Sequence, residues 1–136
     1  MSNYAKYKDL GDGNKPVENF NSKSSDKPRP KFKVYEIQSQ EDKNKLIQHN
    51  KLCVVDIWAE WCQPCKQIAD RYSELASKYS NPGNCVLVKE NVDSKFSTGI
   101  KGVPTFQFFK EGKLVETIVG GDIKEVQKTI ENLLSV

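Results

Sequence analysis

The stretch Leu52-Cys-Val-Val-Asp-Ile-Trp-Ala-Glu-Trp-Cys-Gln-Pro-Cys-Lys66 begins as an apolar run and ends with two cysteines separated by two residues. The run over 52–58 is short and rich in β-branched side chains, which predicts a buried strand. Apolar residues then recur at helical spacing as far as Tyr79, which predicts a helix with one buried face. Cys62 is therefore expected at a strand-to-helix junction, where free N–H groups and the helix dipole favour a thiolate. Pro64 needs no backbone donor in a first helical turn. The pair predicts a redox dithiol.

The same stretch carries a resemblance to a known family. Val55-Asp-Ile-Trp-Ala-Glu-Trp-Cys-Gln-Pro-Cys-Lys66, followed by Gly102-Val-Pro-Thr105 and then Gly120, resembles thioredoxins from about Phe32 to the C-terminus. The resemblance implies an α/β thioredoxin fold over 32–136, with a central mixed β-sheet flanked by helices on both faces. It also implies a thiol–disulfide oxidoreductase that reduces protein disulfides through a mixed disulfide, and thereby serves electron transport and cell redox homeostasis.

The resemblance assigns the catalytic roles. It makes Cys62 the exposed nucleophile and Cys65 the buried resolving thiol, and the two form the redox disulfide. Asp56 lies on an otherwise apolar strand, where burial raises the pKa of a carboxyl group. The family uses this position as a general acid/base for the resolving cysteine, and Lys89 matches a buried lysine that faces it. A structural salt bridge for Asp56 and an exposed position for Lys89 are the alternatives.

A second set of residues is expected to bind the substrate. Pro104 resembles a cis-proline beside the dithiol, which would leave the Val103 backbone free to pair with an extended peptide. The residues between the cysteines help to set the redox potential, and here they include Gln63 in place of the usual glycine. A trans proline at a loop end and a core role for Trp58 are the alternatives. The expected substrate-binding residues are Trp58, Trp61, Gln63, Pro64, Val103, Pro104 and Gly120.

Length and charge divide the chain into two parts. Its 136 residues are enough for one domain with a core but short for two. Residues 1–33 carry eight Lys or Arg and four Asp or Glu, whereas the rest carries thirteen and fourteen, so the net charge of +3 belongs to the N-terminus. Residues 1–31 predict a low-complexity basic extension, disordered or loosely attached. It is either a solvated extension or an arm for a partner or an anionic surface. No basic face for nucleic acid is expected in the folded part.

The composition of the sequence and its family resemblance also predict the location and partners of the protein. No stretch is apolar over the eighteen or so residues that a membrane-spanning helix needs, and Met1–Lys8 lacks the apolar core of a signal peptide. We therefore expect a cytoplasmic monomer without a membrane span. The resemblance implies no bound cofactor or metal, protein disulfides as substrates, and electrons from an NADPH-dependent thioredoxin reductase.

The remaining segments predict a mixed sheet with helices on both faces. A strand–helix–strand passage of this length implies a parallel crossover between the second and third strands. Ser39 and Asp122 are expected helix N-caps, because each precedes a helical pattern. The expected strands are 32–37, 52–58, 86–92, 105–109 and 114–119, the last two forming a hairpin, and the expected helices run from 39 to 49, from the dithiol to 79, and from 122 towards the C-terminus.

Other chemistries remain as alternatives. His49 is the single histidine and lies among polar neighbours, so we expect it at the surface, which argues against a Cys–His protease or acyl transferase. Zinc sites of four cysteines usually pair two Cys-x-x-Cys motifs, and only one is present. Cys53 and Cys85 are expected on opposite sheet faces as small buried hydrophobes. The alternatives to a reductase are a disulfide oxidase or isomerase and a thioredoxin-fold docking module.

Overall fold

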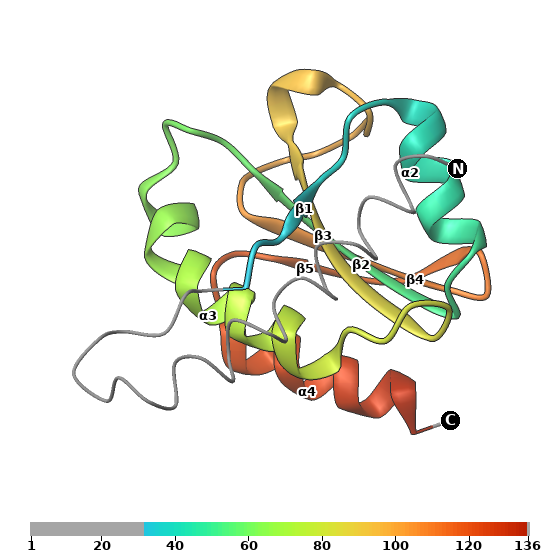
Figure 1. Ribbon diagram of the computed structural model, residues 1–136. Helices are drawn as coiled ribbons and strands as arrows, with labels where there is room; N and C mark the ends of the chain where they lie inside the picture. Colours follow the sequence, from blue (N-terminus) through green and yellow to red (C-terminus); the bar gives the residue numbers. More distant parts are fainter. Residues whose placement is uncertain (1–31, 136) are drawn as a thin grey trace, which may run out of the picture.

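Strand β2, Leu52–Trp58, is the central strand of a five-stranded sheet in a computed structural model that describes residues 32–135. The strand order is β1-β3-β2-β4-β5 (Figure 1). β1 (Tyr35–Glu36) and β3 (Cys85–Asn91) run parallel to β2, while β4 (Thr105–Lys110) is antiparallel to β2 and pairs with β5 (Lys113–Val119). Helices cover both faces of β2, which explains why its sequence is apolar on both faces, except at Asp56, and does not alternate between apolar and polar residues.

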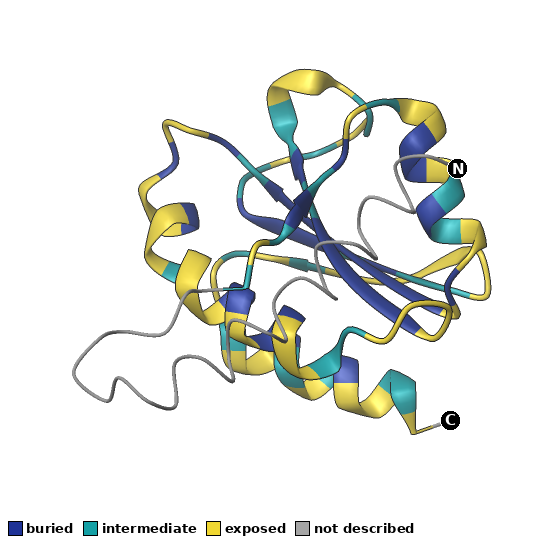
Figure 2. Cartoon of the chain, viewed as in Figure 1, coloured by how far each residue is buried: buried dark blue, intermediate teal, exposed yellow. Residues whose placement is uncertain are grey.

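Two hydrophobic cores lie on opposite faces of this sheet. Helices α3 (Gln63–Tyr79) and α4 (Ile123–Leu134) pack on one face, and α2 (Gln40–Gln48) packs on the other (Figure 1). Alternate residues of β2 point into each core, with Val54 on the α3 side and Val55 on the α2 side. Figure 2 shows the buried residues concentrated in the central strands and on the sheet-facing sides of the helices. The α/β architecture expected from the sequence is confirmed.

Local sequence patterns predicted most of the helix ends and turns correctly. The Ser39 side chain accepts a hydrogen bond from the Asp42 backbone N–H at 3.0 Å, and Asp122 accepts one from Glu125 N–H at 3.2 Å, so both predicted N-caps are confirmed. The turn between β4 and β5 has positive φ at Glu111 (53°) and Gly112 (83°), a geometry that matches the twist of a hairpin. The predicted parallel crossover from β2 through α3 to β3 is also confirmed.

Four of the five predicted strands have different boundaries in the structure, although β4 and β5 are each only one residue longer than expected over 105–109 and 114–119. The expected strand over 32–37 is reduced to Tyr35–Glu36, because the Phe32 carbonyl accepts a hydrogen bond from Ser73 on α3 and does not pair with β3. The strand expected over 86–92 spans Cys85–Asn91 instead. Val92 starts a 3₁₀ turn, η1 (Val92–Ser94), which the Asn91 side chain caps by accepting from Asp93 N–H at 2.8 Å.

The predictions for residues 1–31 lie outside the described residues. Within 32–135, none of the helices combines the length and the apolar character that crossing a membrane requires.

Candidate active site

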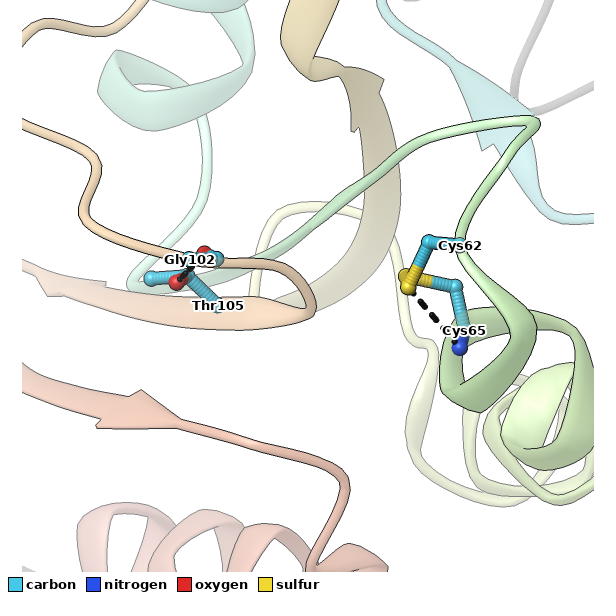
Figure 3. Close-up of a disulfide and its surroundings, with 4 residues drawn as sticks. All are labelled: Cys62, Cys65, Gly102 and Thr105. Atoms are coloured by element: carbon cyan, nitrogen blue, oxygen red, sulfur yellow. Dashed lines mark hydrogen bonds between the residues drawn. A yellow bond between two sulfur atoms is a disulfide. The ribbon is translucent and has the colours of Figure 1, made fainter.

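The two closely spaced cysteines lie at the start of helix α3, just after the end of strand β2. Cys62 is the N-cap of the helix, and its Sγ accepts a hydrogen bond from the Cys65 backbone N–H at 3.2 Å. Cys62 and Cys65 form a disulfide with their Cα atoms 5.3 Å apart (Figure 3). Pro64 lies in the first turn, where helix geometry leaves its nitrogen without a required partner. This places the Cys62 sulfur next to free N–H groups at the positive end of a helix, which stabilise a thiolate.

The burial of the pair corrects one expectation. Cys62 and Cys65 are each only 4% exposed, so the prediction of an exposed Cys62 beside a buried Cys65 is wrong for this disulfide form. The bond turns the Cys62 sulfur toward Cys65, and both join a buried cluster with Ala59. In contrast to the two cysteines, their neighbours in the same turn are exposed: Trp61 is 69% exposed, and Gln63 and Pro64 are exposed as well. Exposed side chains of the turn therefore lie next to two sulfur atoms that are almost inaccessible to solvent. The side chains that pack against the cluster are Trp58, Val92 and Val103.

Asp56 and Lys89 are direct neighbours across β2 and β3, as expected. Asp56 is 5% exposed, and one of its carboxylate oxygens, Oδ1, has no hydrogen-bond partner. Burial raises the pKa of the Asp56 carboxyl group from 3.8 to about 7, with nearby Lys89 opposing this shift and Glu36 adding to it. Lys89 is half-buried, and its amino group lies 5.0 Å from the centroid of the Trp58 ring. The pair thus combines a carboxyl group that titrates near neutral pH with an adjacent cation.

A cavity links this carboxyl group to the dithiol. Its volume is about 700 Å³, and Asp56, Cys65, Trp58 and Lys89 all contribute to its lining. It lies on the α3 side of the sheet, since Tyr72 and Ser73 of α3 also line it. Polar groups and this volume are sufficient for water to enter. Asp56 and Cys65 therefore line one common cavity.

The loop before β4 forms the other side of the dithiol. The Val103–Pro104 peptide bond is cis, which confirms that expectation, and the Val103 side chain packs against the cysteine cluster. The Pro104 carbonyl accepts a hydrogen bond from Gly120 N–H at 2.8 Å, so the end of β5 is fixed to this loop. Gly120 has a φ of 110°, a conformation that favours glycine. Figure 3 shows the disulfide on the side of α3 that faces the turn from Gly102 to Thr105.

Sequence reasoning missed Val92 as a neighbour of the cysteines. Val92 packs against the cysteine cluster although it lies 27 residues beyond Cys65. The strand pattern could have predicted this contact. Strands β2 and β3 are parallel and end side by side at Trp58 and Asn91, so the residues that follow the two strands lie at the same edge of the sheet.

The other candidate ligands lie apart from this site. Cys53 and Cys85 are buried in the cores on opposite faces of the sheet, as predicted, and burial raises the pKa of both thiols. His49 is exposed at the end of α2, with its Nδ1 2.7 Å from the Lys45 carbonyl oxygen, which confirms its surface position. Over the described range 32–135, no three His, Cys, Asp or Glu side chains are grouped so that they could hold a metal ion.

Comparison with known proteins gives one consistent result. The family model described as Thioredoxin matches residues 33–132. A thioredoxin-like protein from Fusarium culmorum is 38% identical over 109 residues, covering 74% of this chain and 90% of its own length. Thioredoxin H-type 2 from Nicotiana tabacum is 42% identical over 95 residues, covering 67% and 78%. The solved thioredoxin from Plasmodium falciparum superposes with a TM-score of 0.66 at 34% identity, covering 73% of this chain and 98% of that one.

Proposed function

The chain belongs to the thioredoxin family, has its fold and is a thiol–disulfide oxidoreductase, and we propose that it acts as a reductase of protein disulfides. The observation that carries the proposal is the Cys62–Cys65 pair at the start of α3, beside a buried carboxyl group that titrates near pH 7. A dithiol needs a thiolate to attack and a second thiol close enough to release the mixed disulfide. The α3 turn holds the two sulfurs at bonding distance, so the second step needs no diffusive encounter.

The proposed reaction has two steps. The Cys62 thiolate attacks one sulfur of a substrate disulfide, which forms a mixed disulfide and releases the other substrate sulfur as a thiolate that takes up a proton. Cys65 then loses its proton, attacks the Cys62 sulfur and releases the second substrate thiolate. The substrate gains two electrons, and the protein is left with the Cys62–Cys65 disulfide seen in the structure.

We assign the proton transfer in the second step to Asp56. Its carboxyl group lines the cavity that Cys65 also lines, and its pKa of about 7 allows it to accept and return a proton near neutral pH. Lys89 faces Asp56 across β2 and β3, and we propose that its charge keeps the pKa from rising further.

We propose that the substrate binds as an extended segment against the Val103–Pro104 turn. The exposed face around the disulfide offers Trp61, and the loop end is fixed by Gly120 through the Pro104 carbonyl. Strand-like pairing would supply backbone hydrogen bonds independent of the substrate's sequence. The proposed binding residues are Trp58, Trp61, Gln63, Pro64, Val103, Pro104 and Gly120.

Two cysteine variants test the reaction. Cys62→Ser removes the nucleophile, so reduction of insulin disulfides by the protein with dithiothreitol as electron source should fall to the uncatalysed rate. Cys65→Ser keeps the nucleophile but lacks the resolving thiol, so it should accumulate a stable mixed disulfide that mass spectrometry detects. The free Cys53→Ser variant is the control and should behave as the unmodified protein. Full activity of Cys62→Ser in this assay would contradict the proposal. A biological function that survives Cys62→Ser, with insulin reduction lost, would favour a docking module.

The direction of the reaction depends on the reduction potential. Equilibration with glutathione should give a value near the −270 mV of reducing thioredoxins; a value near −120 to −180 mV would favour the oxidase or isomerase alternative. We propose that electrons come from an NADPH-dependent thioredoxin reductase, so NADPH consumption should require that enzyme, this protein and a disulfide together.

The domain boundary, location and oligomeric state are also proposals. We propose that residues 32–136 fold as one unit and that 1–31 form a basic extension. A chain of residues 32–136 should therefore unfold cooperatively within a few degrees of the full chain and reduce insulin at the same rate. We further propose a cytoplasmic monomer, because a reducing compartment keeps the dithiol and the two further cysteines as thiols. Sedimentation of the full chain and imaging of a tagged copy test these points.

A further inference from the structure

A buried ion pair lies in the core behind the dithiol. The Lys43 amino group on α2 donates to Glu90 Oε1 on β3 at 2.7 Å, and the side chains of the two residues are 5% and 1% exposed. The partners are 47 residues apart in sequence. Glu90 lies two residues beyond Val88 on the face of the sheet covered by α2, so the ion pair lies against the apolar core on that face. The Lys43 amino group also lies 5.8 Å from the centroid of the Phe109 ring.

Ser97 forms hydrogen bonds with both members of this ion pair. The Ser97 hydroxyl accepts a hydrogen bond from Lys43 Nζ at 2.5 Å and donates one to Glu90 Oε1 at 3.2 Å. Ser97 belongs to the segment 92–103, which connects β3 to the cis-proline turn. In Figure 1 this segment follows β3 at the top of the view, on the side where α2 begins. We call Lys43, Glu90 and Ser97 the anchor.

The anchor holds a segment that otherwise has few ties to the fold. Among the described residues, the other hydrogen bonds of segment 92–103 are local: Asp93 to Asn91, Lys95 to Val92, and Thr105 to Gly102. Its apolar side chains, among them Phe96 and Ile100, are only partly buried against the core. The Ser97 hydroxyl therefore fixes the middle of the segment to both α2 and β3.

The two ends of the segment touch the active site. Val92 and Val103 both pack against the cluster of Cys62, Cys65 and Ala59, and both also pack against the α2-side core that contains the anchor. A shift of the segment would therefore move the Val103–Pro104 turn relative to the disulfide. An apolar pair of similar volume would satisfy the core as well as a buried ion pair does, but it could not hold a hydroxyl in a fixed direction.

We propose that Lys43, Glu90 and Ser97 are positioning residues that hold segment 92–103 so that the Val103–Pro104 turn is preformed for an extended protein substrate. This inference rests on the proposed reductase function. It assigns the anchor to substrate binding and not to the chemistry at sulfur, since the hydrogen bonds of the three side chains join them to one another and not to Cys62 or Cys65. The anchor should matter for a substrate that pairs with the turn and be irrelevant for a disulfide too small to do so.

Ser97→Ala is the sharpest variant, because it removes one hydroxyl and leaves the ion pair in place. The reduced protein is mixed with insulin or with 2-hydroxyethyl disulfide, and the rate constant is measured for each. With insulin, Ser97→Ala should be slower by about three- to tenfold, the equivalent of one ordinary hydrogen bond, and the loss should appear in KM and not in kcat. With 2-hydroxyethyl disulfide the rate should be unchanged. Ser94→Ala, three residues earlier on an exposed turn, is the matched control and should match the unmodified protein with both substrates.

A second variant separates positioning from folding. The double change Lys43→Met with Glu90→Leu replaces the ion pair by apolar side chains, and urea unfolding should show a cooperative transition as steep as that of the unmodified protein. It should show the same selective loss with insulin, because Ser97 has lost its partners. Equal insulin rates in Ser97→Ala and the unmodified protein would overturn the proposal, as would an equal loss with both disulfides, which would place the effect on the dithiol. If the unmodified protein reduced neither disulfide, the proposed function would fail first and the anchor's role with it.

Discussion

Asp56 shows how burial determines chemistry at a single residue. Its carboxyl group is 5% exposed, and desolvation raises its pKa from 3.8 to about 7 in spite of the neighbouring Lys89. Each unit of pKa corresponds to about 1.4 kcal/mol, so keeping Asp56 ionised in the folded state costs on the order of 4 kcal/mol. The residue that carries this energetic cost lines the same cavity as Cys65. The residue is therefore better suited to transfer protons than to stabilise the fold.

The variant Asp56→Asn separates the effect of this residue on stability from its effect on proton transfer. The folded state binds the Asp56 proton more tightly than the unfolded chain does, so this group contributes its full stability below about pH 4 and the contribution is lost as pH rises to about 7. At pH 8, Asp56→Asn should therefore be more stable than the unmodified protein by up to a few kcal/mol, measured by urea unfolding, with little difference at pH 4.

The same variant should lose activity. Resolution of the mixed disulfide should slow by about a hundredfold at pH 7, because no carboxylate accepts the Cys65 proton. Stopped-flow measurement of substrate release reports this step. Glu116→Gln, which changes an exposed carboxylate on β5, is the control and should alter neither property. An unchanged rate and pH profile in Asp56→Asn would remove the proposed role.

At the scale of elements, the Tyr72 hydroxyl ties the apolar face of helix α3 to the sheet. The Tyr72 hydroxyl donates to the Val88 carbonyl at 2.8 Å and lies 3.2 Å from the Val54 carbonyl, so it contacts both β2 and β3. Its ring centroid is 5.6 Å from that of Phe106 on β4. Tyr72 is 2% exposed and lies on the same helix as Cys62 and Cys65. The contact therefore sets the position of the active-site helix against the central strands.

Tyr72→Phe should lower the free energy of unfolding by about 1–2 kcal/mol, since a buried hydrogen bond is lost while the ring packing remains. Urea denaturation followed by circular dichroism measures this change. Tyr79→Phe is the matched control on the same helix: its hydroxyl donates to Glu131 at an exposed site, so its loss should cost less than about 0.5 kcal/mol. Equal costs for the two variants would show that Tyr72 contributes by packing alone.

At the scale of the whole molecule, the four cysteines occupy two kinds of environment. Cys62 and Cys65 lie at the end of β2 where α3 begins, whereas Cys53 and Cys85 are 0% exposed in the two cores. Burial raises the pKa of both core thiols, which suppresses the reactive thiolate. The four cysteines of the chain therefore fall into one reactive and one inert pair.

Thiol counting tests this division. The reduced native protein should react rapidly with 5,5′-dithiobis(2-nitrobenzoic acid) at two of its four cysteines, and at all four only in denaturant. The Cys53→Ser and Cys85→Ser variants should leave the rapid phase unchanged. A rapid phase of three or four thiols in native buffer would contradict the burial of the core pair.

Local patterns allowed much of this to be predicted from the chain. The N-caps Ser39 and Asp122, the hairpin turn at Gly112 and the dithiol at the start of α3 depend on residues only a few positions apart. Strand ends were less certain, because the end of β1 depends on the contact of Phe32 with α3 and not on its own sequence. The resemblance supplied the cis bond at Pro104 and the pairing of Asp56 with Lys89, which local patterns alone do not encode.

By itself, then, the sequence determined a mixed sheet with helices on both faces and a cysteine pair at a helix start, because periodicity, capping and turn chemistry act over short distances. Tertiary structure decided the 4% exposure of Cys62, the neutral-range pKa of Asp56 and the meeting of Lys43 with Glu90 and Ser97. Each of these depends on how much water is excluded and on which distant charge is brought near. Those quantities arise only when β2, β3, α2 and α3 pack together.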